Sequence, residues 1–250
     1  MKILLINPNT TQEFTDRILS IAQRYAAPST EVAAMTPAYG PRSIESIYDE
    51  LLSSMGTLEL ALSKLDEYDG FVIACYSDHP TIYALREVTD KPVLGIAEAS
   101  MYMACMLGHK FSVVTTNEEW EPLLMDAVNH YGLADRCSSV RSTGMPVLAL
   151  ESASPEETYQ MILTASKRAI DQDGAEVICL GCAGMTGMDK ALENDLNVPV
   201  IDGVVSALKL IEGMVGYGVH TSKRKAYAIP GKKELVGVAP IFSKAYRDAE

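Results

Sequence analysis

Two cysteines, Cys75 and Cys182, each lie at the end of a run of apolar residues of strand length. The first run covers residues 71–74, and the second covers residues 177–180 and is followed by Gly181. In an open parallel sheet, ligands bind outside the carboxyl ends of the strands, so each thiol is expected at such an edge. Two cysteines in equivalent positions therefore predict a paired site.

Two thiols that face one cleft from opposite sides could serve as a base and an acid. We expect helix N-termini and backbone N–H groups beside each cysteine to lower the thiol pKa, so that a thiolate is available near neutral pH. The thiolate would remove a proton from a carbon next to a carbonyl, and the opposing thiol would return a proton to the other face. Backbone N–H groups after each cysteine would hold the developing enolate oxygen. This chemistry inverts a stereocentre and requires no metal or organic cofactor.

The elements that must position these thiols alternate between apolar strands and amphipathic helices. Strands are expected at residues 2–7, 31–35, 71–75, 92–96, 110–115, 137–141, 177–181 and 198–202, with helices in between. Such alternation predicts an α/β protein with parallel sheets and helices on both faces.

The second half of the chain repeats the first. The spacing is 108 residues between Lys2 and Lys110, and it is 107 residues between Cys75 and Cys182. A nearly fixed offset indicates an internal duplication. We therefore predict two pseudo-symmetric lobes, each a parallel four-stranded sheet with flanking helices, and an active-site cleft between them.

The lobes are assigned as follows: residues 1–96 and 205–250 form the first lobe with a C-terminal helix and tail, and residues 97–204 form the second. The tail is expected to wrap the first lobe or the surface. Glu98 and Asp202 follow equivalent strands and are expected to be structural hydrogen-bonding groups at the lobe junction.

The composition restricts the partners. A formal net charge of −12 argues against nucleic acid, because binding phosphates requires clustered Lys and Arg. No apolar stretch approaches the roughly 20 residues that span a bilayer, and the apolar run at residues 3–6 is too short for a signal core.

Five cysteines in a chain without a signal core suggest free thiols in a reducing compartment. We predict a cytoplasmic homo-oligomer that binds a small molecule.

Cys179 and Cys182 form a C-x-x-C, a pattern also found in redox disulfides and in half of a zinc site. Cys179 falls inside the expected strand, and no second C-x-x-C or His-x-x-x-His completes a metal-binding set. We predict no metal site. Cys105 and Cys179 are expected to be buried as small hydrophobic residues, and Cys137 has no functional context.

Several motifs occur in a characteristic order: Asn-Pro-Asn-Thr at 7–10, Ala-Cys at 74–75, Phe-Ser-Val-Val-Thr-Thr at 111–116, Leu-Gly-Cys-Ala-Gly-Met at 180–185 and Pro-Val-Ile-Asp-Gly at 199–203. Together they resemble the hydantoin racemases and allantoin racemases of the Asp/Glu racemase superfamily. The resemblance implies that the catalytic pair is Cys75 and Cys182. It also implies substrate contacts by these residues: Asn9, Thr115 and Thr116, and the backbone around Tyr76, Ser77, Ala183 and Gly184.

The loop after the first cysteine departs from this family. The family usually continues into Asp-Pro-Gly, whereas Asp78 is followed here by His79 and Pro80. The additional histidine is expected in the loop that lines the cleft. It could contact substrate or tune Cys75, or it could be a loop histidine that faces water.

The residues beside the cysteines bear on the substrate. Amino-acid racemases of the superfamily tend to carry Asn-Thr after the first cysteine and Thr-His after the second, whereas Tyr-Ser and Ala-Gly occur here. Fewer polar groups to hold a carboxylate and an ammonium favour a neutral cyclic amide. We predict a cofactor-independent racemase of a cyclic ureide, either a 5-substituted hydantoin or allantoin. The alternatives are an amino-acid racemase, a maleate-type cis-trans isomerase and a non-catalytic binding protein, which would not need both thiols.

Overall fold

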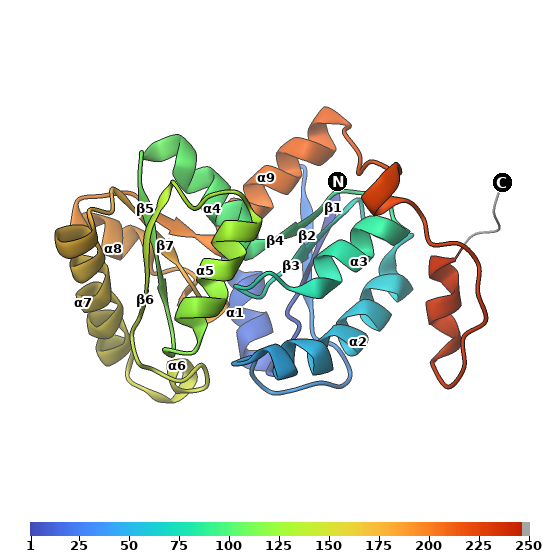
Figure 1. Ribbon diagram of the computed structural model, residues 1–250, viewed down its shortest axis with the longest axis horizontal. Coiled ribbons are helices and arrows are strands. Elements are labelled where there is room, and N and C mark those ends of the chain that lie inside the picture. Colours follow the sequence, from blue (N-terminus) through green and yellow to red (C-terminus); the bar gives the residue numbers. More distant parts are fainter. Residues whose placement is uncertain (247–250) are drawn as a thin grey trace.

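The computed structural model describes residues 1–246, which form two parallel four-stranded sheets lying side by side (Figure 1). The first sheet has the order β2-β1-β3-β4, with β1 (Lys2–Ile6), β2 (Glu31–Met35), β3 (Gly70–Ile73) and β4 (Val93–Gly95). The second has the order β6-β5-β7-β8, with β5 (Phe111–Thr115), β6 (Cys137–Ser142), β7 (Val177–Leu180) and β8 (Val200–Asp202). The predicted α/β class with two equivalent sheets is confirmed.

Helices connect the strands. They are α1 (Gln12–Tyr25), α2 (Ile47–Lys64), α3 (Pro80–Val88), α4 (Ile96–Leu107), α5 (Trp120–His130), α6 (Ala149–Ser152), α7 (Pro155–Asp173), α8 (Asp189–Leu196) and α9 (Gly203–Tyr217), with short 3-10 helices η1 (Ala183–Met185), η2 (Lys225–Tyr227) and η3 (Pro240–Ala245). The short helices α6 and η1 were not expected from the sequence. Within residues 1–246, no helix combines the length and the apolar character that crossing a membrane requires.

The strands β1, β3 and β7 are apolar on both faces, as expected where helices cover both sides of a sheet. In β1, Ile3 and Leu5 pack on one face, while Leu4 and Ile6 pack on the other. The successive side chains of a strand point in opposite directions, so a continuous apolar run fills two separate cores.

One of these cores is shared by the two sheets. It joins Val72 of β3 to Cys179 of β7 through residues of α4 and α9, such as Met101 and Leu208. Helix α4 packs against both α9 and β7, and Figure 1 shows α4 and α9 at the junction of the sheets. The relative placement of the sheets is therefore fixed by apolar burial.

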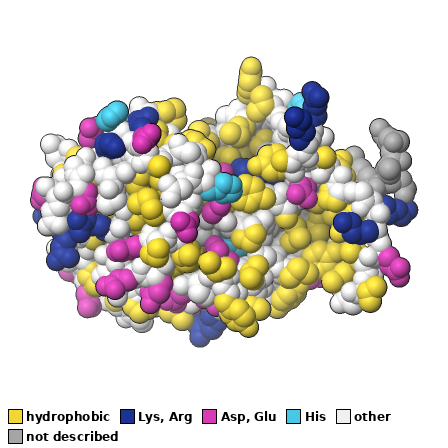
Figure 2. Space-filling model, viewed as in Figure 1, with side chains coloured by type: hydrophobic (Ala, Val, Ile, Leu, Met, Phe, Trp, Pro, Cys, Tyr) yellow, Lys and Arg dark blue, Asp and Glu magenta, His cyan; other side chains and the backbone are white. Residues whose placement is uncertain are grey.

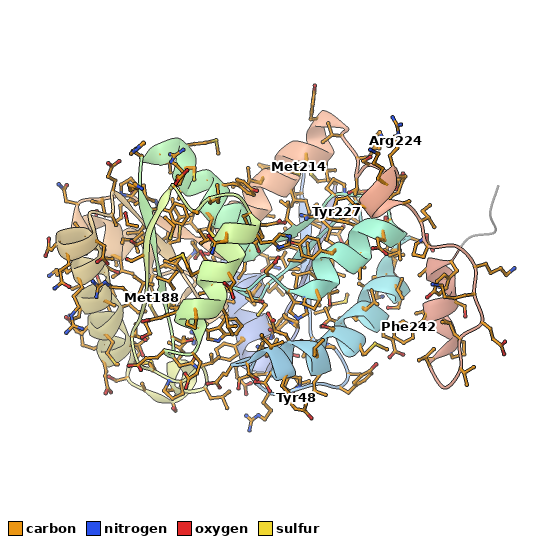
Figure 3. All side chains as sticks on the ribbon, viewed as in Figure 1. Tyr48, Met188, Met214, Arg224, Tyr227 and Phe242 are labelled. Atoms are coloured by element: carbon orange, nitrogen blue, oxygen red, sulfur yellow. The ribbon has the colours of Figure 1, made fainter. Side chains whose placement is uncertain are left out.

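The C-terminal segment lies on helices of the first sheet. The 3-10 helix η2 packs on α3, and η3 packs on α2 through the buried Phe242, which lies on the side of η3 facing α2 in Figure 3. The Thr221 hydroxyl donates to the Lys91 carbonyl (3.0 Å). The last residues of the predicted tail, 247–250, lie outside the described part of the chain. The division into lobes at residues 96 and 205 stays a prediction.

Helix α2 carries an apolar face that is open to solvent. Figure 2 shows hydrophobic side chains gathered along the lower part of the view, where α2 lies. These side chains are 42% to 70% exposed, and they are Ile47, Tyr48, Leu51, Leu52 and Met55. Contiguous apolar surface of this kind is typical of protein–protein contacts. The homo-oligomer stays a prediction, and the exposed face of α2 is a surface through which two copies could associate.

Asp202 connects the second sheet to the junction. One carboxylate oxygen accepts hydrogen bonds from the backbone N–H groups of Val204 (2.8 Å) and Val205 (3.2 Å) and so caps α9. The other oxygen accepts from the Thr186 hydroxyl (2.7 Å) and the Gly187 N–H (2.8 Å). The carboxylate therefore ties the loop after β7 to the start of α9.

We expect Asp202→Ala to lower the free energy of unfolding by about 2 to 4 kcal/mol, because it removes a helix cap and leaves buried donors unpaired. Urea unfolding followed by circular dichroism measures the change. Asp171→Ala, at an exposed position of α7, is the matched control. A loss no larger than that of the control would contradict the structural role of Asp202.

Candidate active site

Cys75 and Cys182 line the same pocket, which opens at the carboxyl ends of β3 and β7. The pocket encloses about 450 Å³, part of which is open to solvent. It is lined by Asn9, Phe14, Ile44, Ala74, Cys75, Tyr76, Thr116, Trp120, Val147, Gly181, Cys182, Ala183 and Gly184. Elements from both sheets therefore contribute to one cavity, as the pseudo-symmetry predicts.

Backbone contacts at the end of β7 fix the position of Cys182. The Gly181 N–H donates to the Val114 carbonyl (2.7 Å), and the Thr115 hydroxyl donates to the Gly181 carbonyl (3.0 Å). A Cβ atom at position 181 would lie 2.7 Å from the Val114 oxygen, so only glycine fits here. After Cys182 the chain turns into η1, and the Gly184 N–H donates to Cys182 Sγ (3.4 Å).

The loop after Cys75 is held from two sides. The Ser77 hydroxyl donates to Cys75 Sγ (3.4 Å), and the Tyr76 hydroxyl pairs with that of Ser100 (2.8 Å) in the shared core. The Asp78 carboxylate accepts from the Tyr131 hydroxyl (3.1 Å) at the end of α5, which belongs to the second half of the chain. The loop that carries the first cysteine is thus connected directly to the opposite half.

The acidities of the two thiols differ from the sequence-based expectation. Burial raises the pKa of Cys182 to about 11, although the Gly184 N–H and the Arg17 guanidinium act to lower it. Burial also raises the pKa of Cys75, and the nearby Glu50 carboxylate raises it further. Both shifts oppose the expected thiolate near neutral pH, because desolvation outweighs the backbone and hydroxyl donors.

The Asn-Pro-Asn-Thr loop presents Asn9 to the pocket. The Asn7 side chain is buried and donates to Asn9 Oδ1 (2.9 Å), and the Thr11 N–H donates to the same oxygen (2.9 Å). Both donors occupy the Asn9 oxygen, which leaves the amide N–H₂ group to face a ligand. Asn7 is thus a supporting residue that the sequence motif contains but does not distinguish from Asn9.

An apolar wall of the pocket was missed by sequence reasoning. It consists of Phe14, Ile44, Trp120 and Val147. The duplication contained a signal for two of them, since Phe14 and Trp120 lie 106 residues apart in the first turns of the equivalent helices α1 and α5. Ile44 and Val147 come from irregular loops, where no periodicity marks a pocket residue.

Three predicted contact residues lie outside the pocket lining. Thr115 is buried and supports Gly181, while Ser77 is buried and touches the Cys75 sulfur instead of the cavity. His79 is 0% exposed, with Nε2 bonded to the Ser53 hydroxyl (2.9 Å) and Nδ1 accepting from the Thr81 N–H (3.3 Å). His79 neither lines the cleft nor faces water, because it caps the start of α3. The other predicted positions line the pocket: Asn9, Cys75, Tyr76, Thr116, Cys182, Ala183 and Gly184.

The C-x-x-C pattern is divided between two environments. Cys179 is fully buried in the shared core, where its thiol points to the Ser100 carbonyl (3.8 Å), whereas Cys182 faces the pocket. Within the described part of the chain, no group of three or more His, Cys, Asp or Glu side chains could hold a metal ion.

Comparisons with known proteins agree with this geometry. Residues 3–211 match the family model described as Asp/Glu/hydantoin racemase. The chain is 47% identical to a hydantoin racemase of Pseudomonas sp. (strain NS671), and the match covers 98% of both chains. The chain belongs to the Asp/Glu/hydantoin racemase family. It is an enzyme of the isomerase class.

Further relatives give the same family. A hydantoin racemase of Rhizobium meliloti is 40% identical over 95% of this chain and 98% of its own. An allantoin racemase from Klebsiella pneumoniae superposes with a TM-score of 0.92 at 38% identity, over 98% of this chain and 99% of its own. Arylmalonate decarboxylase, at 16% identity and a TM-score of 0.62 over 91% of this chain and 97% of its own, shares the fold alone.

His79 generates a prediction about stability and pH. Burial lowers its pKa to about 4, against about 6.5 in an unfolded chain, so the unfolded state binds the proton first as the pH falls. Stability contributed by neutral His79 is present above pH 6.5 and is lost toward pH 4. Between pH 7 and 4.5, the wild type should lose about 2 kcal/mol more unfolding free energy than His79→Gln. Urea unfolding at both pH values measures this.

His220→Gln, at an exposed position after α9, is the control and should lose the same free energy as the wild type. An equal pH dependence in His79→Gln and the wild type would show that His79 binds a proton as readily in the folded state as in the unfolded state.

Proposed function

We propose that the protein is a cofactor-independent racemase that inverts the stereocentre of a cyclic ureide by proton transfer between two thiols. The observation that carries this proposal is the placement of Cys75 and Cys182 in the lining of one pocket, at equivalent ends of two equivalent sheets. Membership of the Asp/Glu/hydantoin racemase family supports it.

In this mechanism one cysteine, as thiolate, removes the proton from the ring carbon next to the carbonyl. The electron pair moves onto the carbonyl oxygen to form an enolate, and the thiol of the other cysteine protonates the opposite face. One turnover therefore exchanges the protonation states of Cys75 and Cys182. The Asn9 amide, the Thr116 hydroxyl and the backbone of η1 are the polar groups available to hold the ring and the enolate oxygen.

The pocket favours a neutral ring as substrate. Among residues 1–246, those that line it include no Lys, Arg, Asp or Glu, so a free carboxylate and ammonium would meet no opposite charge in the lining itself. This disfavours an amino acid. The wall of Phe14, Ile44, Trp120 and Val147 suits an apolar substituent on the ring. We therefore favour 5-substituted hydantoins with apolar side chains over allantoin, whose substituent is polar. Because the mechanism needs reduced thiols, a cytoplasmic location is part of the proposal.

Cys75→Ala and Cys182→Ala should each reduce racemisation by at least about 10³-fold, because either change removes a proton-transfer group. Enantiopure hydantoins with apolar and polar 5-substituents, allantoin and L-glutamate are followed by the loss of optical rotation. In deuterated water, the wild type should introduce deuterium at the stereocentre of the ureides.

Cys105→Ala, a thiol on α4 outside the pocket, is the matched control and should keep wild-type activity. Wild-type racemisation by either pocket variant would refute the two-base mechanism. Turnover of glutamate without turnover of the ureides would place the enzyme among the amino-acid racemases instead.

The raised thiol pKa values predict the pH dependence of the rate. Below a pKa of about 11, the fraction of Cys182 thiolate grows tenfold with each pH unit, so the reactive form increases as the pH rises. After subtraction of spontaneous racemisation, log kcat/KM should rise with a slope near one between pH 7 and 9. A plateau that begins below pH 7 would mean that the reacting thiolate is formed much more easily than burial implies.

A further inference from the structure

The two cysteines of the pocket face opposite charges. On the Cys182 side, Arg17 of α1 reaches the η1 loop, where its Nη1 donates to the Gly184 carbonyl (2.7 Å). The N–H of the same Gly184 donates to Cys182 Sγ (3.4 Å). Arg17 therefore acts on Cys182 in two ways: it holds Gly184, the residue whose N–H contacts the sulfur, and it places a positive charge near that sulfur.

On the Cys75 side, the charged group with the largest influence on the thiol is a carboxylate. Glu50 of α2 has a buried Oε1 without a hydrogen-bond partner among the described residues. Its carboxylate also interacts with the side chain of Ser77, whose hydroxyl donates to Cys75 Sγ (3.4 Å). The negative charge of Glu50 opposes ionisation of Cys75. The pKa of Glu50 is itself raised by burial and, to a smaller extent, by Asp78, while Ser77 acts to lower it. A thiolate at Cys75 would therefore lie beside a second negative charge, which is unfavourable in a buried site.

Other charged groups do not cancel this asymmetry. Glu45 raises the pKa of Cys182, but its influence is smaller than that of either the Gly184 N–H or Arg17. The two thiols also oppose each other, since ionised Cys182 raises the pKa of Cys75. Once Cys182 has lost its proton, Cys75 is therefore even more strongly kept as a thiol.

We propose that Arg17 is a positioning residue that makes Cys182 the first thiol of the pocket to ionise, while Glu50 keeps Cys75 protonated. The inference builds on the proposed racemase function and assigns the starting roles within it. Cys182 is the base and Cys75 the acid in the state that binds substrate first. The enantiomer whose stereocentre proton faces Cys182 is then the one that the resting enzyme can deprotonate directly.

Alkylation by iodoacetamide tests this assignment without any substrate. Thiolates react and thiols do not, so at a pH below the pKa the rate follows the thiolate fraction. Rates at pH 8 are measured separately for Cys75 and Cys182 by peptide mass spectrometry, in the wild type and in Arg17→Gln, Arg17→Lys and Glu50→Gln. Arg24→Gln, at an exposed position of the same helix α1, is the control.

Arg17→Gln should slow alkylation of Cys182 by about tenfold, as expected when a nearby positive charge that lowers a pKa by about one unit is removed. Cys75 should react at an unchanged rate. Arg17→Lys should restore most of the Cys182 rate, because it keeps the charge. Glu50→Gln should accelerate Cys75 several-fold without slowing Cys182, and Arg24→Gln should change neither rate.

A purely structural role of Arg17 gives the opposite sign, since a loosened η1 loop would expose Cys182 and speed its alkylation. Faster or unchanged alkylation of Cys182 in Arg17→Gln would therefore overturn the proposal. So would a Glu50→Gln variant in which Cys75 reacts no faster, which keeps the test decisive if Arg17→Gln does not fold. Because no ureide is present, these outcomes are independent of whether the racemisation assay succeeds.

Discussion

The structure depends on the apolar core that the two sheets share. Helix α9 packs on β3 and α4 packs on β7, and these two helices pack on each other, so burial of one sheet cannot be separated from burial of the other. This packing sets the carboxyl ends of two equivalent strands on one cavity. A proton-transfer site with two opposite faces requires this arrangement, because each face of a flat ring must meet a different group.

The burial that brings the two cysteines together also opposes their ionisation. Both thiols are withdrawn from water, and desolvation raises both pKa values despite the N–H and hydroxyl donors at the sulfur atoms. The opposite charges of Arg17 and Glu50 then make the two thiols differ in how easily they ionise, whereas the duplication alone would make them equivalent. A symmetrical scaffold therefore carries an unsymmetrical electrostatic environment, as is typical of sites in which one group acts as acid and its partner as base.

Direct contacts between the halves add to the shared core at the two cysteine loops. Asp78, three residues after Cys75, binds Tyr131 directly after α5, and Gly184, two residues after Cys182, is bound by Arg17 of α1. Each loop is thus held by the half of the molecule that does not contain it. These polar links join the two halves close to Cys75 and Cys182, so the distance between the thiols is constrained near the pocket as well as by the distant core.

The sequence by itself determined the order of strands and helices along the chain, the duplication, and the pairing of Cys75 with Cys182. It could do so because hydrophobic periodicity and repeat spacing are properties of the linear sequence. It also marked Asn9 and the Gly-Cys-Ala-Gly loop, where unusual residue types occur together. Only the tertiary structure decided that His79 is buried behind the pocket, that Ile44 and Val147 line it, and that Arg17 and Glu50 face different cysteines. The pKa values of the two thiols also depend on the tertiary structure. A sequence motif identifies the hydrogen-bond donors around a thiol, whereas desolvation depends on every element packed around it.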